Sequence, residues 1–246
     1  VAAKVKACRE IGFRSSLLRF PSQVSQTELL ETIQRLNEDP LVHAIIVQLP
    51  LPGHINELEI AMAVDVQKDV DGFHPENLGR LMIGLPGFVS ATPLGILLLL
   101  RHYQIPTSGM HCVVVGRSNI VGTPISLLMS RNTSGGNSTV TLCHSRTRDL
   151  AMHTRQADIL IVALGKPGFI NAGMVKDGAV VVDVGITRLP DAGTPKGYRI
   201  SGDVDFQSVA PRTSWITPVP GGVGAMTIAA LMHNTLEAWK RKYQPQ

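Results

Sequence analysis

The chain has 246 residues, 44% of them hydrophobic and 17% charged, with a formal net charge of +4. This composition excludes a disordered chain and is ordinary for an α/β enzyme built from one large or two small domains. The basic residues are scattered, which excludes the basic tail of a nucleic-acid-binding or membrane-binding protein, and the modest positive charge suits a small anionic ligand.

The first third of the chain is predicted to alternate between helix and strand. Residues 1–11 form an amphipathic helix that ends before Gly12, and residues 15–21 form a short strand. Ser25 and Glu28 make a capping box ahead of a helix with apolar residues at helical spacing. Residues 42–52 are a buried strand stopped by prolines, residues 56–64 are helical, and residues 67–90 are a long irregular connection.

A second α/β unit is predicted from Thr92, which caps a helix at residues 93–104. Helical segments then link strands at residues 111–116, 138–144, 158–165 and 179–186. Four strands rich in Val, Ile and Leu with helical links indicate a doubly wound parallel sheet of the Rossmann-like type. A Pro/Gly turn and a long closing helix follow, and we expect that helix to pack back against the first unit.

The segment "VVVGRSNIVGTP" follows a predicted strand and opens a helix. Gly116 and Gly122 would let the phosphates of a dinucleotide approach backbone N–H groups at the helix start. Ser118 holds the second glycine position of the usual GxGxxG motif. The alternative is a plain, tight strand-to-helix turn.

The next strand lacks the carboxylate that normally binds the ribose 2′-hydroxyl of NAD. It continues "CHSRTRD", so that Ser145 stands where the acid is expected and Arg117 lies on the preceding turn. Because an arginine accommodates a 2′-phosphate, this pattern favours NADP over NAD. Two alternatives remain open: Arg117 and Ser145 are solvated surface residues, or Asp149 is the missing acid.

Several polar residues outside this unit are candidates for substrate chemistry. Gln48 ends a predicted strand, where open α/β sheets place their ligands, or is a solvated strand terminus. Asp69, Asp71 and His74 lie in the long connection and either bind a ligand or shape turns, and they match no metal-ligand pattern. Lys4 has apolar neighbours and is either a general base or a solvated side chain.

The remaining signals concern the location of the protein and its ends. Three widely separated cysteines without a CxxC pair indicate neither a disulfide framework nor a zinc site, and the apolar run at residues 94–100 is too short to cross a bilayer. We therefore expect a cytoplasmic protein, with an organelle as the alternative. Because the chain begins without Met and already in a helical pattern, we expect a segment upstream of it.

Nine motifs in this order resemble the methylenetetrahydrofolate dehydrogenase/cyclohydrolase family over essentially the whole chain. They are "VAAK" followed by "GF", "VQLPLP", "KDVDGF", "ATPLG", "VVVGRSNIVGTP", "TVTLCHSRT", "DVGI", "GDVDF" and "ITPVPGGVGAMT". The resemblance implies a folate-binding catalytic α/β domain at residues 1–93, completed by a closing helix at residues 224–246, and an NADP-binding domain at residues 94–223. It also implies a homodimer, with folate bound in the cleft between the two domains.

The resemblance further implies roles for particular residues. Lys4 matches the lysine of the family's YxxxK motif, whose tyrosine would fall immediately before Val1. Gln48 would hydrogen-bond and tune Lys4, and Asp71 would bind the pterin edge. The implied catalytic residues are Lys4, Gln48 and Asp71; the implied NADP-binding residues are Gly116, Arg117, Ser118, Ser145 and Ile186; the implied substrate-binding residues are Val47, Gln48, Leu49, Asp71, Pro220, Gly221, Gly222, Val223 and Gly224; and no metal is implied.

The implied activity is NADP-dependent oxidation of 5,10-methylenetetrahydrofolate to the methenyl compound and hydrolysis of that product to 10-formyltetrahydrofolate. The chain departs from the family where Ala91 and Leu94 replace a cysteine and a basic residue. Two alternative functions are an NADP-dependent dehydrogenase of another small substrate and a non-catalytic NADP-binding module. The Pro/Gly turn alone is explained nearly as well by a helix entry as by close approach of a flat ligand.

Overall fold

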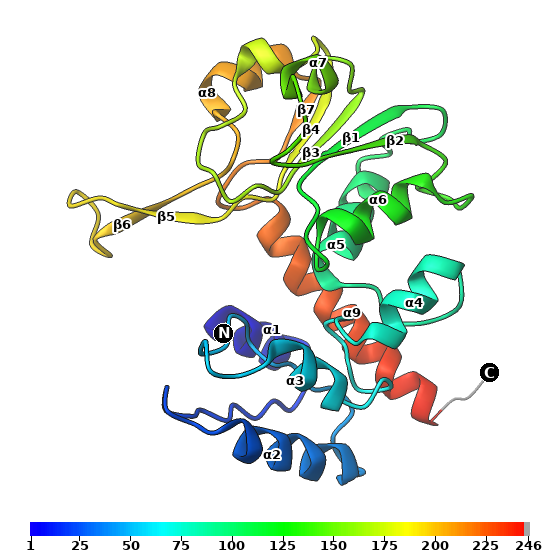
Figure 1. Ribbon diagram of the computed structural model, residues 1–246, viewed down its shortest axis with the longest axis vertical. Helices are drawn as coiled ribbons and strands as arrows, with labels where there is room; N and C mark the ends of the chain where they lie inside the picture. Colours follow the sequence, from blue (N-terminus) through cyan, green and yellow to red (C-terminus); the bar gives the residue numbers. More distant parts are fainter. Residues whose placement is uncertain (244–246) are drawn as a thin grey trace. The chain divides into compact units, whose positions relative to one another are not determined.

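The structure, a computed structural model, describes residues 1–243 (Figure 1). The chain divides into two compact units. Unit 1 comprises Val1–Ala91 and the chain from Ile228 onward, and unit 2 comprises Thr92–Thr227. Mixed α/β architecture with a parallel sheet confirms the predicted fold class.

Unit 2 is built on a five-stranded parallel sheet in the order β2-β1-β3-β4-β7. The predicted strands are present as β1 (His111–Val115), β2 (Thr139–Cys143), β3 (Ile159–Val162) and β4 (Val180–Asp183). The links include α6 (Gly122–Ser130), α7 (Leu150–Thr154) and the 3₁₀ turn η1 (Ala172–Met174). β1 and β3 are almost wholly buried because helices and loops cover both faces of a doubly wound sheet.

Some elements of unit 2 were not predicted. β7 (Trp215–Ile216) adds a fifth strand, and β5 (Thr187–Pro190) pairs with β6 (Tyr198–Ser201) as a separate antiparallel hairpin. The short elements α8 (Phe206–Val209) and η2 (Ala210–Arg212) follow the hairpin. A two-residue strand carries no hydrophobic periodicity, so the sequence alone does not reveal β7.

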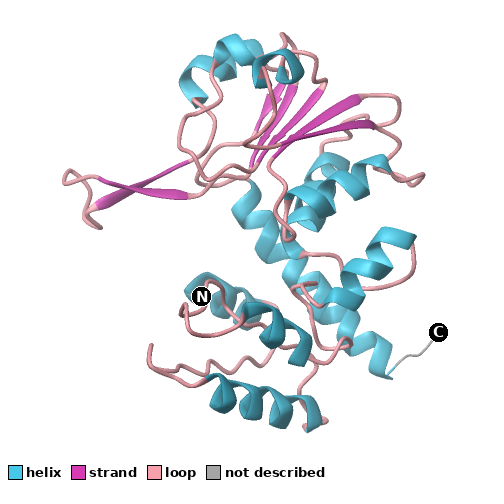
Figure 2. Cartoon of the chain, viewed as in Figure 1, coloured by secondary structure: helices cyan, strands magenta, loops and turns pink. Residues whose placement is uncertain are grey.

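Unit 1 is largely helical in the described residues (Figure 2). It contains α1 (Ala2–Glu10), α2 (Gln26–Glu38), α3 (Glu57–Ala63), α4 (Pro75–Ile83) and most of α9 (Val223–Tyr243). The predicted cap of α2 is present, since the Ser25 hydroxyl accepts the N–H of Glu28 at 3.1 Å. A core between α2, α3 and their connections consists of Val24, Leu29, Ile33, Ile45, Ile55, Ile60 and Val64.

Three predictions for unit 1 were wrong. Residues 15–21 form no strand, and the predicted strand at 42–52 is reduced to one parallel bridge between Ile45 and Asp69. The connection at 67–90 contains α4, whose N-cap is His74 and whose C-cap is Gly84 in the left-handed conformation. The sequence signals for this helix were Pro75 at its first position and a glycine after its last residue. The many turn-forming residues around it favoured the prediction of an irregular connection.

The start of α5, at the boundary between the two units, differs from the prediction. α5 (Ala91–His102) begins one residue before Thr92, so Thr92 lies inside the helix and is not its cap. Its hydroxyl instead lies 3.0 Å from that of Thr227. Within the described residues, no helix has both the length and the apolar character needed to cross a bilayer.

Candidate functional site

Lys4 and Asp71 form a charged pair in unit 1. Lys4 lies on α1 and Asp71 in the loop before α4, and Lys4 Nζ is 4.0 Å from Asp71 Oδ2. The side chains are 25% and 12% exposed, respectively, so neither charge is fully solvated. Burial raises the pKa of Asp71 to about 6, although Lys4 opposes the shift. A carboxyl that titrates near neutral pH beside an ammonium group is suited to proton exchange with a bound substrate.

Close backbone packing holds Asp71 in place. Gly72 has φ +71°, and a Cβ there would lie 2.6 Å from the backbone nitrogen of Ser90. The Ser90 hydroxyl in turn donates to the carbonyl of Gly72 at 3.0 Å. The buried amide of Asn234, on α9, donates to the carbonyls of Val70 and Val89 at 2.9 Å each.

Asn234 is not among the predicted site residues, although the sequence carries a signal for it. It stands within the helical run that buries Ala230 and Leu231, where a polar residue requires partners. Its two hydrogen bonds connect the residue before Asp71 to the residue before Ser90. Asn234 therefore supports the geometry of the Lys4–Asp71 pair through the backbone.

The other candidates in the 67–90 connection have structural roles. The Asp69 carboxylate accepts the N–H groups of Phe73 and His74, at 3.2 and 2.8 Å, and the side-chain amide of Asn77 at 2.9 Å. His74 Nδ1 accepts the N–H of Glu76 at 3.0 Å and so caps α4. These bonds favour the turn-shaping alternative for Asp69 and His74.

Gln48 is exposed, and its side-chain amide donates to the carbonyl of Leu49 at 3.0 Å. Among the residues that the structure describes, no hydrogen bond joins Gln48 to Lys4 or Asp71. The flanking Val47 packs against the core of unit 1, and Leu49 is half-buried ahead of a cis Leu49–Pro50 bond. The tuning of Lys4 by Gln48 remains a prediction.

The glycine-bearing turn of unit 2 connects β1 to α6 with very close backbone contacts. Gly116 has φ +127°, and a Cβ there would lie 2.2 Å from the carbonyl oxygen of Ala163. A Cβ on Gly122 would lie 1.9 Å from the carbonyl oxygen of Gly116. Both positions therefore require glycine.

Ser118 takes part in this turn through its side chain. Its hydroxyl oxygen accepts the N–H groups of Val121 and Gly122 at 3.2 and 3.3 Å. A hydroxyl that accepts two N–H groups still has its own hydrogen to donate. Ser118 can thus cap the start of α6 and donate to a ligand at the same time.

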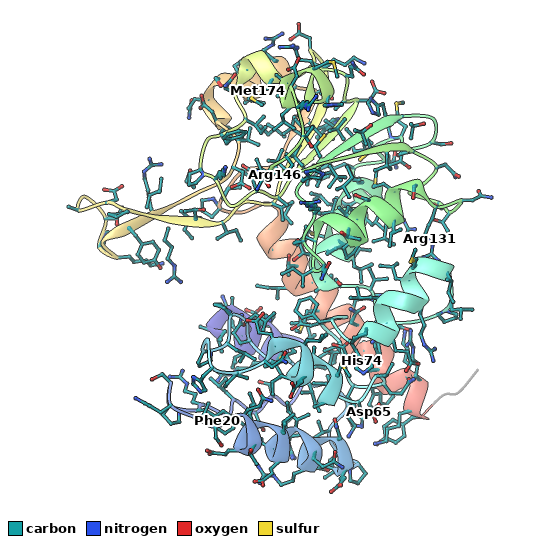
Figure 3. The ribbon with its side chains drawn as sticks, viewed as in Figure 1. Phe20, Asp65, His74, Arg131, Arg146 and Met174 are labelled. Atoms are coloured by element: carbon teal, nitrogen blue, oxygen red, sulfur yellow. The ribbon has the colours of Figure 1, made fainter. Side chains whose placement is uncertain are left out.

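Arg117 and Ser145 lie at equivalent positions on neighbouring strand ends. β1 and β2 are parallel, and Val115 pairs with Cys143. Arg117 lies two residues after Val115, and Ser145 lies two residues after Cys143. Both are exposed. The adjacent Arg146, labelled in Figure 3, lies in the same turn, and its backbone N–H donates to the side-chain Nδ1 of His144 at 3.1 Å. This register brings a guanidinium and a hydroxyl to one edge of the sheet.

Asp149 has a structural task at this edge. It adopts φ +43° and its carboxylate accepts the N–H of Met152 at 3.2 Å, which caps α7. A carboxylate that caps a helix start is held by the helix dipole and its N–H groups. This observation favours Ser145 over Asp149 as the residue that faces a ribose.

Ile186 and the Pro/Gly turn come together in unit 2. Ile186 follows β4 and is 63% exposed, and a Cβ on Gly224 would lie 3.5 Å from its Cδ1. The turn contains a cis Val219–Pro220 bond and Gly221 with φ +109°, and Gly222 approaches the carbonyl oxygen of Pro218 closely. Val223 is buried, so among the predicted substrate-binding residues it contributes to packing.

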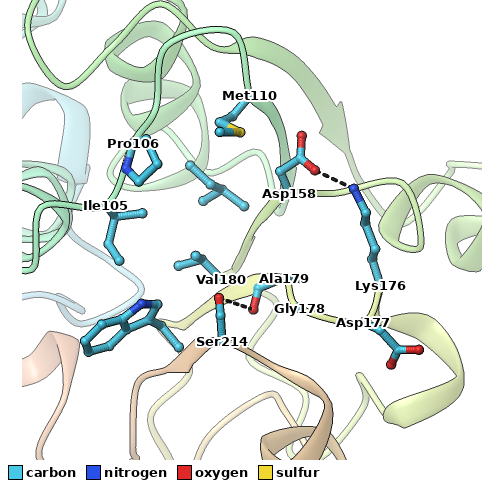
Figure 4. A pocket seen from close by; sticks show the side chains of 12 residues that line it. Ile105, Pro106, Met110, Asp158, Lys176, Asp177, Gly178, Ala179, Val180 and Ser214 are labelled. Carbon is cyan, nitrogen blue, oxygen red and sulfur yellow. Dashed lines mark hydrogen bonds and ion pairs between the residues drawn. The ribbon is translucent and has the colours of Figure 1, made fainter.

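A cavity of about 280 Å³ lies at the opposite, amino edge of the same sheet (Figure 4). Its lining includes the starts of β3, β4 and β7. The polar groups on its wall are already paired: Lys176 Nζ lies 2.5 Å from Asp158 Oδ1, and Asp158 Oδ2 accepts the N–H of His111 at 2.9 Å. The predicted cofactor-binding residues lie instead at the carboxyl edge of this sheet, where polar groups converge and remain available.

Comparison with known proteins identifies related sequences across both units. The family model described as tetrahydrofolate dehydrogenase/cyclohydrolase, catalytic domain, matches residues 1–71, and that of its NAD(P)-binding domain matches residues 90–243. The bifunctional protein FolD of Porphyromonas gingivalis is 60% identical over 244 residues, which cover 99% of this chain and 82% of the relative.

Two crystal structures resemble this fold closely. The bifunctional FolD methylenetetrahydrofolate dehydrogenase/cyclohydrolase of Campylobacter jejuni is 47% identical, with a TM-score of 0.91 over 98% of this chain and 82% of that one. The Trypanosoma brucei dehydrogenase-cyclohydrolase, solved with NADP cofactor and an inhibitor, is 38% identical, with a TM-score of 0.93 over 99% and 82% of the two chains.

Proposed function

This chain belongs to the tetrahydrofolate dehydrogenase/cyclohydrolase family, and from that premise we propose how its residues perform the two reactions. The enzyme oxidises 5,10-methylenetetrahydrofolate to the 5,10-methenyl compound with NADP, and hydrolyses that cation to 10-formyltetrahydrofolate. The observation that carries the proposal within the structure is the pair formed by the partly buried Lys4 and the buried Asp71.

Lys4 and Asp71 serve the hydrolysis. Water must attack the methenyl carbon and lose a proton, and a nitrogen of the folate must gain one before the ring opens. Lys4 would move these protons, with Asp71 holding its ammonium group and binding the pterin edge. Gln48 would orient Lys4 by rotating away from the carbonyl of Leu49.

The residues at the carboxyl edge of the sheet fit NADP. Bound NADP supplies the hydride acceptor for the oxidation. Arg117 and Ser145 would hold the 2′-phosphate, since both are donors on adjacent strand ends and the nearby Asp149 carboxylate is engaged in its cap. Gly116 and Ser118 would let the rest of the cofactor approach the backbone, and Ile186 would lie beside the nicotinamide.

The two domains follow from the same reading. We assign residues 1–93 and 224–246 to the folate-binding catalytic domain and residues 94–223 to the NADP-binding domain. The division of the chain into units at 91/92 and 227/228 supports these boundaries. The substrate would also contact Val47, Leu49 and the Pro/Gly turn, Pro220 to Gly224.

The test is to mix the protein with 5,10-methylenetetrahydrofolate and NADP⁺ and to follow reduced nicotinamide by absorbance. We expect NADP⁺-dependent reduction, with NAD⁺ a much poorer acceptor, and decay of added methenyltetrahydrofolate without cofactor. Reduction only with another small alcohol or amine would show a different dehydrogenase. Tight NADP⁺ binding without turnover would show a binding module.

The assembly and location of the enzyme are also proposals. A two-stranded hairpin is marginally stable by itself, and β5 and β6 pair only with each other among the described strands, which supports burial of this hairpin in a homodimer. The unpaired cysteines support a reducing compartment, taken to be the cytoplasm. Light scattering on a gel-filtration column would test the dimer, and a monomer mass at micromolar concentration would reject it.

A further inference from the structure

Two aspartates of unit 2 are buried near the predicted nicotinamide site but have no role in the mechanism above. Asp183 ends β4, and Asp203 follows β6. Both are almost wholly inaccessible to solvent. Burying two carboxylates in one region of a sheet edge is costly, so their presence requires an explanation.

All the hydrogen bonds to these carboxylates within residues 1–243 come from backbone N–H groups. Asp203 Oδ2 accepts those of Leu164 and Gly165, at 2.6 and 2.8 Å, in the loop after β3. Asp203 Oδ1 is buried without a partner in the described structure. Asp203 therefore anchors the β3 loop through one oxygen.

Asp183 binds both the turn that follows β4 and the segment that follows β6. Its Oδ1 accepts the N–H groups of Gly185 and Asp203, at 2.9 and 3.0 Å, and its Oδ2 accepts that of Val204 at 2.9 Å. The two aspartates thus form a continuous chain of bonds from the β3 loop, through the 203–204 segment, to the turn that carries Ile186.

Glycines at this turn show how tightly the carboxylates fit the backbone. A Cβ on Gly185 would lie 2.4 Å from Asp203 Cγ, and one on Gly202 would lie 2.0 Å from Asp183 Oδ2. Neither carboxylate can move without moving the adjacent turn. The position of the Ile186 backbone is therefore coupled to both side chains.

We propose that Asp183 and Asp203 are positioning residues for the dehydrogenase reaction, which fix the β3 loop and the Ile186 turn so that the nicotinamide is held in register with the folate. The inference rests on the proposed function. Misplacement of a reacting group by about 1 Å lowers a rate by about 100-fold, so a fixed turn is important for hydride transfer. Methenyl hydrolysis, which uses Lys4 and no cofactor, does not depend on this turn.

The test compares Asp203→Ala, Asp203→Asn and Asp205→Ala. Asp203→Ala removes the acceptor for Leu164 and Gly165, so dehydrogenase kcat should fall at least tenfold. The NADP⁺ dissociation constant and the cyclohydrolase rate should stay within about threefold, since Arg117, Ser145 and Lys4 are untouched. Asp203→Asn keeps a carbonyl oxygen for both N–H groups and should restore most of kcat. Asp205→Ala, in the same loop, is the matched control and should match wild type.

Amide hydrogen exchange without ligand gives a readout that does not depend on activity. Segments 164–165 and 185–186 should exchange faster in Asp203→Ala than in Asp203→Asn. Equal loss of both activities, or unchanged kcat in Asp203→Ala, would overturn the positioning role. If Asp203→Ala does not melt cooperatively, the test uses Asp183→Asn, which removes one of the three hydrogen bonds that Asp183 accepts. A wild-type dehydrogenase kcat in Asp183→Asn would also overturn the proposal.

The two proposals fail in different ways. A wild-type protein that does not reduce NADP⁺ with 5,10-methylenetetrahydrofolate contradicts the proposed function, whatever the exchange data show. A wild-type protein with that activity, combined with an unaffected Asp203→Ala variant, contradicts the positioning role alone.

Discussion

At the scale of single residues, charge and burial divide the work between Lys4, Asp71 and Arg117. Lys4 and Asp71 are partly removed from water and face each other, which suits proton transfer. Arg117 is exposed on a tight turn, which suits capture of an anionic ligand from solution. Substitution of Lys4 should therefore lower a reaction rate, whereas substitution of Arg117 should weaken cofactor binding.

Lys4→Met should lower methenyl hydrolysis by about 100-fold to 10,000-fold, the usual contribution of a positioned acid or base, and leave NADP⁺ binding unchanged. Stopped-flow measurement of methenyltetrahydrofolate decay checks this. Lys6→Met is the matched control, since Lys6 lies on the same helix with a side chain that is 77% exposed. Cyclohydrolase turnover at the wild-type rate in Lys4→Met would reject the assignment.

Arg117→Ala should weaken NADP⁺ binding by about 10-fold to 100-fold, because a hydrogen bond to a charged group contributes about 1.5–3 kcal/mol. NAD⁺ lacks the 2′-phosphate, so its affinity should hardly change. Isothermal titration with both nucleotides checks the difference, and Arg131→Ala, just after α6, serves as control. Equal weakening of both nucleotides would contradict the phosphate assignment.

Asp71→Asn should make the protein more stable at neutral pH. The folded-state pKa of Asp71 is raised from 3.8 to about 6, so the ionised form destabilises the fold as pH rises through that window. The gain in the free energy of unfolding should be small near pH 4 and reach at most roughly 3 kcal/mol above pH 7.

Urea titrations at the two pH values check the Asp71 prediction. Asp158→Asn should show the opposite sign, since the hydrogen bond from Lys176 holds the pKa of Asp158 below its ordinary value. That variant should lose more stability at neutral than at acid pH. A pH-independent difference for Asp71→Asn would contradict the burial argument.

At the scale of elements, α4 fixes the loop that carries Asp71. The helix begins at Pro75 after the N-cap His74 and ends at Ile83, followed by the C-cap Gly84 with φ +85°. Asp69 and Asn77 connect its first turns to the preceding loop. The stability of α4 therefore limits how precisely Asp71 is held against Lys4.

Gly84→Ala should destabilise the protein by about 1–2 kcal/mol, because a Cβ is unfavourable in the left-handed conformation. Gly79→Ala, within the same helix and with open space around its Cβ, should instead stabilise it by about 0.5–1 kcal/mol. Thermal denaturation of both variants checks the pair. If both variants changed the stability in the same direction, the left-handed conformation of Gly84 would not be the cause.

At the scale of the whole molecule, the chain carries two units with separate hydrophobic cores. The predicted cofactor residues belong to unit 2, and the Lys4–Asp71 pair belongs to unit 1. Ligands should therefore stabilise the units differently.

NADP⁺ at 100 times its dissociation constant should stabilise the native protein by about 2.7 kcal/mol. Hydrogen exchange should show protection concentrated at the turns of residues 116–122, 144–149 and 185–186 in unit 2. Calorimetry with and without NADP⁺ gives the first quantity, and exchange mapped by mass spectrometry gives the second. Protection confined to unit 1 would contradict the assignment of the cofactor to unit 2.

Local sequence patterns predict the parallel sheet of unit 2 and the ends of most helices, because buried strands and capped helices depend on local runs and spacings. It also indicated the glycine-bearing turn and the missing acid after β2. It failed for the strand at 15–21, where Leu17 and Leu18 are exposed and Phe20 packs against the core. It also failed for the strand at 42–52, whose apolar residues face the core from a loop, and for β7, whose two residues carry no pattern.

Which polar side chains interact depends on the folded chain and cannot be predicted from their spacing. Asp69 and Asp71 are two positions apart, yet the Asp69 carboxylate accepts backbone N–H groups whereas the Asp71 carboxylate faces Lys4. Asn234 carries no local motif, and the motifs around Asp183 and Asp203 do not show what their carboxylates bind. Apart from Gly185, the partners of these three side chains lie 20 to 164 residues away along the chain. Hydrogen bonds between distant segments depend on the folded path of the backbone, which no spacing in the sequence records.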